Sequence, residues 1–165
     1  MVVFVHEAIH DRTVFESSIH ALSVEWNRSM CRITHQGNFS VCPWIATNNG
    51  QSIQSLQLFN VAKKEVVDSK EIPKSWYGLK IASDNKTVYA SGGNDNVILV
   101  YTIEQDKLVP TSKISLSATP KAIISPAGLE IDDANKTLYV VTKDNNTLYA
   151  IDLVSQKVKE SFPLP

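Results

Sequence analysis

Two histidines near the start of the chain have the spacing of a zinc site. His6, Glu7 and His10 form the pattern H-E-x-x-H. On a helix both imidazoles would lie on one face and bind a single zinc ion, while the carboxylate polarises a metal-bound water. No motif selects a third ligand among Glu16, His20 and Glu25. We therefore expect no metal or other cofactor, and zinc peptidase chemistry is the weaker alternative.

Residue usage divides the chain into two parts. Every Arg, His and Cys lies in the first 42 residues, and every Lys lies at Lys63 or later. The 165 residues carry 16 Lys or Arg against 17 Asp or Glu, and neither part is basic. This balance excludes a general electrostatic attraction to nucleic acid, and no apolar run reaches the ~18 residues of a membrane helix. We expect a leader of uncertain structure at residues 1–43 and a second part at residues 44–165.

The second part is repetitive. The run Asn-Lys-Thr-Val-Tyr at residues 85–89 returns as Asn-Lys-Thr-Leu-Tyr at residues 135–139, and a third, looser copy begins near Trp44. The units are about 44–76, 77–119 and 120–165. Each has β-branched and aromatic runs separated by turn-forming Gly, Asn and Asp, without a helical period. We predict an all-β fold of about three four-stranded antiparallel units that bury their faces against one another.

Residues 139–152, Tyr-Val-Val-Thr-Lys-Asp-Asn-Asn-Thr-Leu-Tyr-Ala-Ile-Asp, resemble the YVTN-type β-propeller repeat, with an extra valine and with Lys143 where Asn is usual. Residues 47–52 and 72–79 are similar to the N-terminal propeller of bacterial proteins that join a YVTN propeller to an alkaline-phosphatase-like phosphoesterase domain. The resemblance covers about residues 44–165. It implies a partial propeller of WD40-like blades in a periplasmic or secreted protein, although residues 1–10 do not read as a signal peptide.

The number of units bears on assembly. Propellers close with roughly four to eight blades, and this chain has about three. We expect a fragment of a longer protein, and the alternative is self-association through open blade faces. In a secreted protein Cys31 and Cys42 could form a disulfide, and the sequence leaves their pairing open.

Ligand-binding candidates are polar turn residues after a strand of each unit, together with residues of the first inter-unit connection. They are Asn48, Asn49, Gln51, Lys74, Trp76, Tyr77, Asn94, Asp95, Asp144 and Asn145. The polar residues are also turn formers, and the aromatic ones either stack on a ligand or pack between units. Residues 44–165 contain no His or Cys, so no catalytic residue is predicted. The sequence predicts a binding or scaffold module for an unidentified small molecule or protein. The first alternative is the propeller part of a phosphoesterase or lactonase-like hydrolase.

Overall fold

A computed structural model describes residues 34–36, 39–48, 51–60, 63–72, 78–117, 119 and 122–165. They form three antiparallel sheets of four strands, in which each strand pairs with the next in sequence. The first sheet contains β1 (Thr34–Gln36), β2 (Phe39–Asn48), β3 (Gln51–Asn60) and β4 (Glu65–Glu71). The second contains β5 (Leu79–Ile81), β6 (Thr87–Ser91), β7 (Val97–Glu104) and β8 (Lys107–Ser115), with a short 3₁₀ helix η1 (Gly93–Asp95). The third contains β9 (Pro126–Asp132), β10 (Thr137–Thr142), β11 (Thr147–Asp152) and β12 (Lys157–Pro163).

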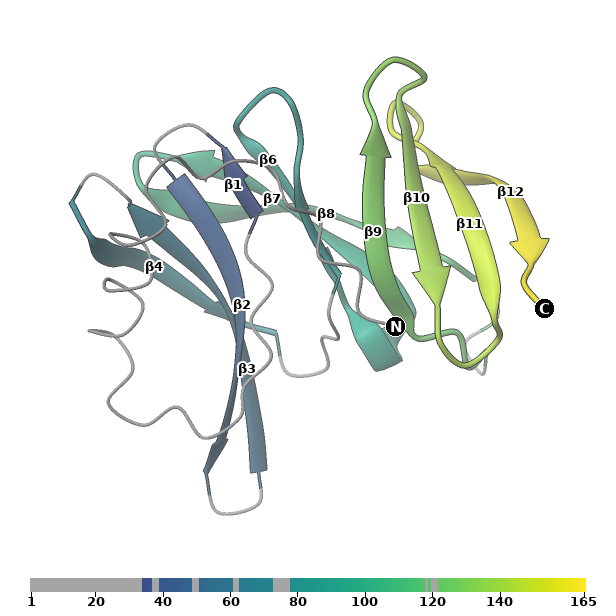
Figure 1. Ribbon diagram of the computed structural model, residues 1–165, viewed down its shortest axis with the longest axis horizontal. Coiled ribbons are helices and arrows are strands. Elements are labelled where there is room, and N and C mark those ends of the chain that lie inside the picture. Colours follow the sequence, from purple (N-terminus) through teal and green to yellow (C-terminus); the bar gives the residue numbers. More distant parts are fainter. Residues whose placement is uncertain are drawn as a thin grey trace.

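The predicted all-β fold of four-stranded antiparallel units is confirmed, and the three sheets follow one another in chain order (Figure 1). The first sheet begins at Thr34, ten residues ahead of the start expected for the first repeat. The division into a leader at residues 1–43 and repeats at residues 44–165 stays a prediction. Within the described part of the chain, no helix is long and apolar enough to span a membrane.

Side-chain alternation gives the second sheet two apolar faces, because successive residues of a strand point to opposite sides. One face packs on the first sheet through a cluster of Leu56, Leu58, Ile72, Leu79, Ile81, Val88, Ala90, Tyr101 and Leu108. The other packs on the third sheet through Ala82, Tyr89, Ile98, Val100, Ile114, Leu116, Ile124, Leu129, Leu138, Val140 and Ile151. Each fully buried side chain of this size contributes about 1.5–3 kcal/mol, so the sheets stabilise one another.

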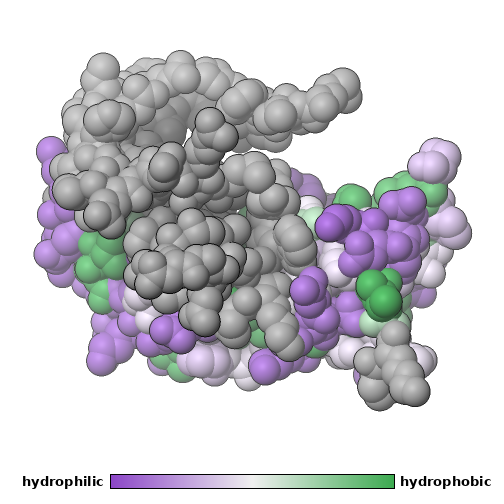
Figure 2. Space-filling view, turned by 90° about the horizontal axis from the view of Figure 1, so that it is seen from below, coloured by the Kyte–Doolittle hydropathy of each residue, from purple (hydrophilic) through white to green (hydrophobic). Residues whose placement is uncertain are grey.

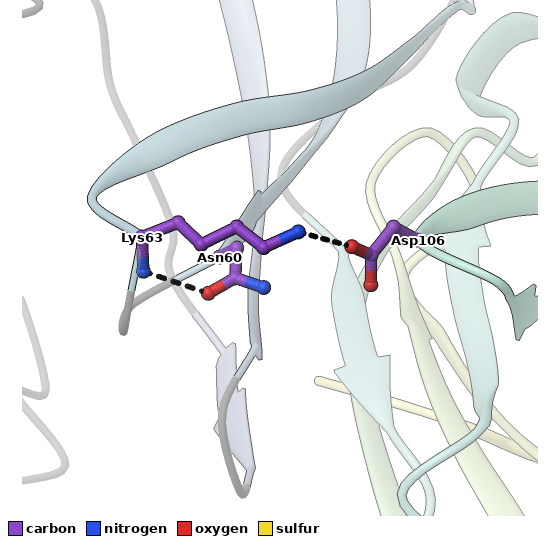
Figure 3. A network of polar contacts seen from close by, with 3 residues as sticks. All are labelled: Asn60, Lys63 and Asp106. Atoms are coloured by element: carbon purple, nitrogen blue, oxygen red, sulfur yellow. Dashed lines mark hydrogen bonds and ion pairs between the residues drawn. The ribbon is translucent and has the colours of Figure 1, made fainter.

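Polar contacts add to this packing at one end of the sheets. Lys63, in the β3–β4 turn, donates its backbone N–H to Asn60 Oδ1 at 3.0 Å, which fixes the turn (Figure 3). Its ammonium group donates to Asp106 Oδ2, in the β7–β8 turn of the second sheet, also at 3.0 Å (Figure 3). Both charged side chains are exposed, so this pair orients the turns and contributes little to stability.

The β5–β6 turn is closed by Asp84. Its Oδ1 accepts hydrogen bonds at 2.8 Å from the backbone N–H groups of Lys86 and Thr87, and Asn85 adopts the left-handed conformation with φ 58°. Burial acts to raise the pKa of Asp84, but the hydrogen bonds from Thr87 and Lys86 outweigh it and hold the pKa below its ordinary value. Asp and Asn are typical turn residues, so the Asp-Asn-Lys sequence suits this turn.

Candidate functional site

The connections β6–β7 (residues 92–96) and β10–β11 (residues 143–146) join the second and third strands of neighbouring sheets. A third segment, residues 122–125, leads into β9 and lies between them. We call these three segments the loop edge. It is at the opposite end of the strands from the β5–β6 and β9–β10 hairpins, which Figure 1 shows as the upper loops of the second and third sheets.

Asn96 connects two segments of the loop edge. It follows η1 in the left-handed conformation with φ 56°, which Asn tolerates better than most residues. Its Oδ1 accepts hydrogen bonds at 3.0 Å from the backbone N–H groups of Ile124 and Ser125, and its Nδ2 donates to the carbonyl of Ala122. A single side chain thus fixes the backbone that enters the third sheet.

Ser125 connects the segment entering β9 to the β10–β11 loop. It is 2% exposed and has a φ of 51°, a conformation that is costly for a residue other than Gly and needs compensating contacts. Its hydroxyl donates to the carboxylate of Asp144, and its carbonyl accepts from Lys143 N–H at 3.0 Å. Asp144 N–H in turn donates to the carbonyl of Ile124 at 3.2 Å. The two segments are therefore paired by main chain and side chain.

Thr142 closes the β10–β11 loop from inside. Its buried Oγ1 accepts from Thr147 N–H at 3.1 Å and lies 2.8 Å from the Thr147 carbonyl oxygen. It also hydrogen-bonds to Asn145 Oδ1, and Asn145 Nδ2 donates to the Tyr149 hydroxyl at 2.8 Å. Asn145 is exposed, yet both ends of its amide are held in place.

The loop of the second sheet is anchored by Ser91. The buried hydroxyl of Ser91 donates to the carbonyl of Pro126 at the start of β9 and accepts from Gly93 N–H at 3.1 Å. Gly93 has a φ of 52°, which suits glycine. Asn94 and Asp95 follow it with exposed side chains.

The structure brings four of the predicted site residues to the loop edge, namely Asn94, Asp95, Asp144 and Asn145. Asn48 ends β2 and Gln51 begins β3, so both flank the corresponding connection of the first sheet. The other predicted residues, Asn49, Lys74, Trp76, Tyr77, His6, Glu7 and His10, lie outside the described part of the chain. Ligand binding by any of these residues stays a prediction.

Sequence reasoning missed Asn96 and Ser125, although both join the loops. One signal was available in the sequence, because Asn96 and Asn146 occupy the same place in two units, 50 residues apart. The structure gives both a positive φ. Ser125 offers no comparable signal, since its role depends on contacts with Asn96 and Asp144 that only the fold creates.

The loop edge presents amides, carboxylates and backbone groups, so its chemistry is hydrogen bonding. The Ser125 hydroxyl beside Asp144 is buried, and residues 78–165, which include the second and third blades, contain no histidine. Within the described ranges, no three His, Cys, Asp or Glu side chains gather closely enough to hold a metal ion.

A scan against known protein families finds no match, and a search of curated proteins finds none either. Solved structures do match. A luciferin-regenerating enzyme is similar over 87% of this chain and 48% of that chain, with 18% identity and a TM-score of 0.65. The Myceliophteria thermophila Cps50 (Swd1) β-propeller domain is similar over 83% and 44%, with 12% identity and a TM-score of 0.62. Kuenenia stuttgartiensis hydrazine synthase is similar over 80% and 35%, with 16% identity and a TM-score of 0.56.

This chain therefore spans between 35% and 48% of the length of those three proteins. Identities this low show the fold alone. The RRP9 WD40 repeats are also among the matches, with a TM-score of 0.54. The three sheets, each packed face to face on the next, are blades of a β-propeller, and the chain has an all-β fold of three four-stranded antiparallel blades.

Proposed function

We propose that this chain is a binding or scaffold module whose loop edge contacts a small molecule or a protein. One observation carries the proposal: Asn96, Ser125 and Asp144 form a continuous chain of hydrogen bonds between the loops of two neighbouring blades. A loop surface that is already ordered loses little conformational entropy on binding. Loops on a rigid scaffold are also the usual place for binding residues.

We further propose that the propeller is of the YVTN type, in a bacterial periplasmic or secreted protein. The sequence of residues 139–152 supports this, and the role of Thr142 gives a physical reason for threonine in that motif. The alternative function is the propeller part of a phosphoesterase or lactonase-like hydrolase. In that case the loop edge would position a partner or substrate and another part of the protein would perform the chemistry.

Site-specific photo-crosslinking tests the binding role. The full chain would carry a photoreactive residue in place of Asn145 at the loop edge or, as a control, in place of Val154. Val154 is 81% exposed in the β11–β12 turn, at the opposite end of the same blade. In an extract of the source cells, we expect several-fold more adduct from position 145 than from position 154. Equal labelling at both positions would contradict the proposal.

A further inference from the structure

We propose that Ile123 is the apolar anchor of the loop edge, and that its partner is a protein whose surface offers an apolar pocket beside an arginine or lysine. The proposal rests on the binding function and deepens it by selecting a protein over a small molecule. Ile123 lies in the segment of residues 122–125, between the loops of the second and third blades. Its side chain is 73% exposed.

The two peptide groups that flank Ile123 are held by one side chain. The carbonyl of Ala122 accepts a hydrogen bond from Asn96 Nδ2, and the N–H of Ile124 donates to Asn96 Oδ1 at 3.0 Å. The Ile124 side chain is 4% exposed in the cluster between the blades, which also holds the segment in place. Ile123 is β-branched, which limits rotation about its χ1. An anchor that is already positioned loses little conformational entropy when a partner binds it.

The exposure of Ile123 does not come from a missing neighbouring sheet. Hydrogen bonds join its segment to the second blade through Asn96 and to the third blade through Asp144, whose N–H donates to the carbonyl of Ile124 at 3.2 Å. Both blades that flank Ile123 are therefore described. A further sheet stacked on the outer face of the third blade would lie beyond that blade and not over this segment. The exposed side chain thus belongs to the surface of the loop edge itself.

The exposed apolar side chain indicates the shape of the partner. Small-molecule sites are concave and enclose most of their ligand, whereas Ile123 projects into solvent and therefore fits a pocket in another molecule. Figure 2 views the molecule from the end that carries the loop edge, and it shows hydrophobic side chains enclosed by hydrophilic ones where the third blade lies. An apolar centre within a polar rim is the usual anatomy of a protein–protein interface.

Asp144 supplies a charge beside the anchor. Its Oδ2 accepts the hydrogen bond from Ser125, while its Oδ1 accepts none within the described residues. The side chain is exposed, so Oδ1 is accessible to a partner. The three segments of the loop edge contain two carboxylates, Asp95 and Asp144, against one ammonium group, that of Lys143. An arginine or lysine next to the partner's pocket would therefore be attracted to this part of the surface.

The experiment uses the full chain with the photoreactive residue at position 145, in an extract of the source cells, at a concentration where adduct yield is proportional to concentration. Mass spectrometry of the adduct should show the added mass of a protein. Ile123→Ser, which removes the apolar side chain, should lower the yield about tenfold. Asp144→Asn, which keeps an acceptor for Ser125 but removes the charge, should lower it several-fold.

Two control variants accompany these changes. Ile123→Val keeps a β-branched apolar side chain at the anchor position. Val154→Ser removes an apolar side chain that is 81% exposed at the opposite end of the same blade. We expect both to leave the adduct yield within about twofold of the unaltered chain. Hydrogen exchange of the Ile124 and Ser125 amides should be equal in the unaltered chain and in Ile123→Ser, because the exposed side chain does not support the segment.

Several results would overturn the proposal while leaving the binding function in place. They are an adduct with the mass of a small molecule and a protein adduct whose yield Ile123→Ser does not lower. Faster exchange of the Ile124 amide in Ile123→Ser would assign Ile123 a structural role and would also overturn it. A yield that Asp144→Asn leaves unchanged would overturn the basic group assigned to the partner. Equal labelling at positions 145 and 154 contradicts the binding function itself, so the two failures are distinguishable.

Discussion

Lys80 and Glu130 occupy equivalent positions in neighbouring blades, 50 residues apart, and their charged groups meet at 2.7 Å. Lys80 lies on β5 and Glu130 on β9, the first strands of their blades. The repeat therefore places opposite charges at one position and joins the blades through them. The same spacing recurs in Ser83, whose hydroxyl donates to Asp133 Oδ1 at 2.7 Å.

Reversing one charge of this ion pair should have a small and salt-dependent effect. The Lys80 and Glu130 side chains are 34% and 62% exposed, so water screens the attraction. We expect Lys80→Glu to lower the free energy of unfolding by about 0.5–1 kcal/mol, and the double variant Lys80→Glu/Glu130→Lys to recover most of the loss. Urea denaturation at low and high salt measures both. A single-variant loss that high salt does not reduce would contradict an electrostatic role.

Removing the Asn96 side chain should be much more damaging than removing that of Asn146. Both residues have positive φ, a conformation that alanine adopts at a cost. Replacing either one with Ala should therefore lower the free energy of unfolding by about 1 kcal/mol through the backbone alone. Asn96→Ala additionally removes three hydrogen bonds to the partly buried backbone of Ala122, Ile124 and Ser125, so the free energy of unfolding should fall by about 2–4 kcal/mol in all. Denaturant unfolding of the two variants isolates the side-chain contribution, and equal losses would refute the role given to Asn96.

Gly78 lies against Ala127 and Leu129 of the neighbouring blade, and it should not accept a side chain. A Cβ at this position would be 2.2 Å from the Ala127 carbonyl oxygen and 2.8 Å from Leu129 Cγ. We expect Gly78→Ala to destabilise the chain by about 2–4 kcal/mol, since backbone must move.

Gly128→Ala is the matched control for Gly78→Ala. The nearest atom to a Cβ at Gly128 is Val141 Cβ at 3.8 Å, an ordinary contact. Its effect on the free energy of unfolding should stay within about 0.5 kcal/mol. Thermal unfolding of both variants makes the comparison, and a tolerated Gly78→Ala would mean that the second and third blades pack less closely than described.

Asp68 should make the free energy of unfolding depend on pH in the acid range. Burial acts to raise the pKa of Asp68, but hydrogen bonds from Leu108 N–H at 2.7 Å and from Lys70 outweigh it and hold the pKa below its ordinary 3.8. A lowered pKa in the folded chain stabilises the fold above pH 3.8, and that contribution is lost as the pH falls through the folded-state pKa. Asp68→Asn should therefore flatten the loss of stability between about pH 5 and pH 2.5. Urea unfolding midpoints across this pH range measure the effect. If the unaltered chain and Asp68→Asn lose stability identically as the pH falls, Asp68 does not cause the pH dependence.

The strands of the second and third blades could be predicted from sequence because their signals are local. Thr87–Ser91 and Thr137–Thr142 are β-branched and aromatic, and each follows a turn rich in Asn and Asp. The interface faces follow from the alternation along these strands. The start of the first sheet at Thr34 was not predicted, since residues 34–43 do not match the repeat.

The arrangement of the loop edge depends on contacts between distant residues. Asn96 meets Ile124 and Ser125 only after two blades have packed, and its sequence context shows nothing beyond a turn former. Asp144 and Asn145 could be proposed from their exposed turn, whereas the hydrogen bond from Ser125 that orients Asp144 could not. The repeat position of Asn96 was therefore the one sequence feature that pointed to the hydrogen bonds joining the loops.

Asn96 holds the loops of the second and third blades together as one fixed surface. Hydrogen exchange of the Ile124 and Ser125 amides in the full chain tests it most directly. These amides should exchange as slowly as those of β9, and Asn96→Ala should accelerate them about tenfold or more relative to β9, while Asn146→Ala leaves them unchanged. Exchange at the rate of an exposed loop in the unaltered chain would contradict the claim.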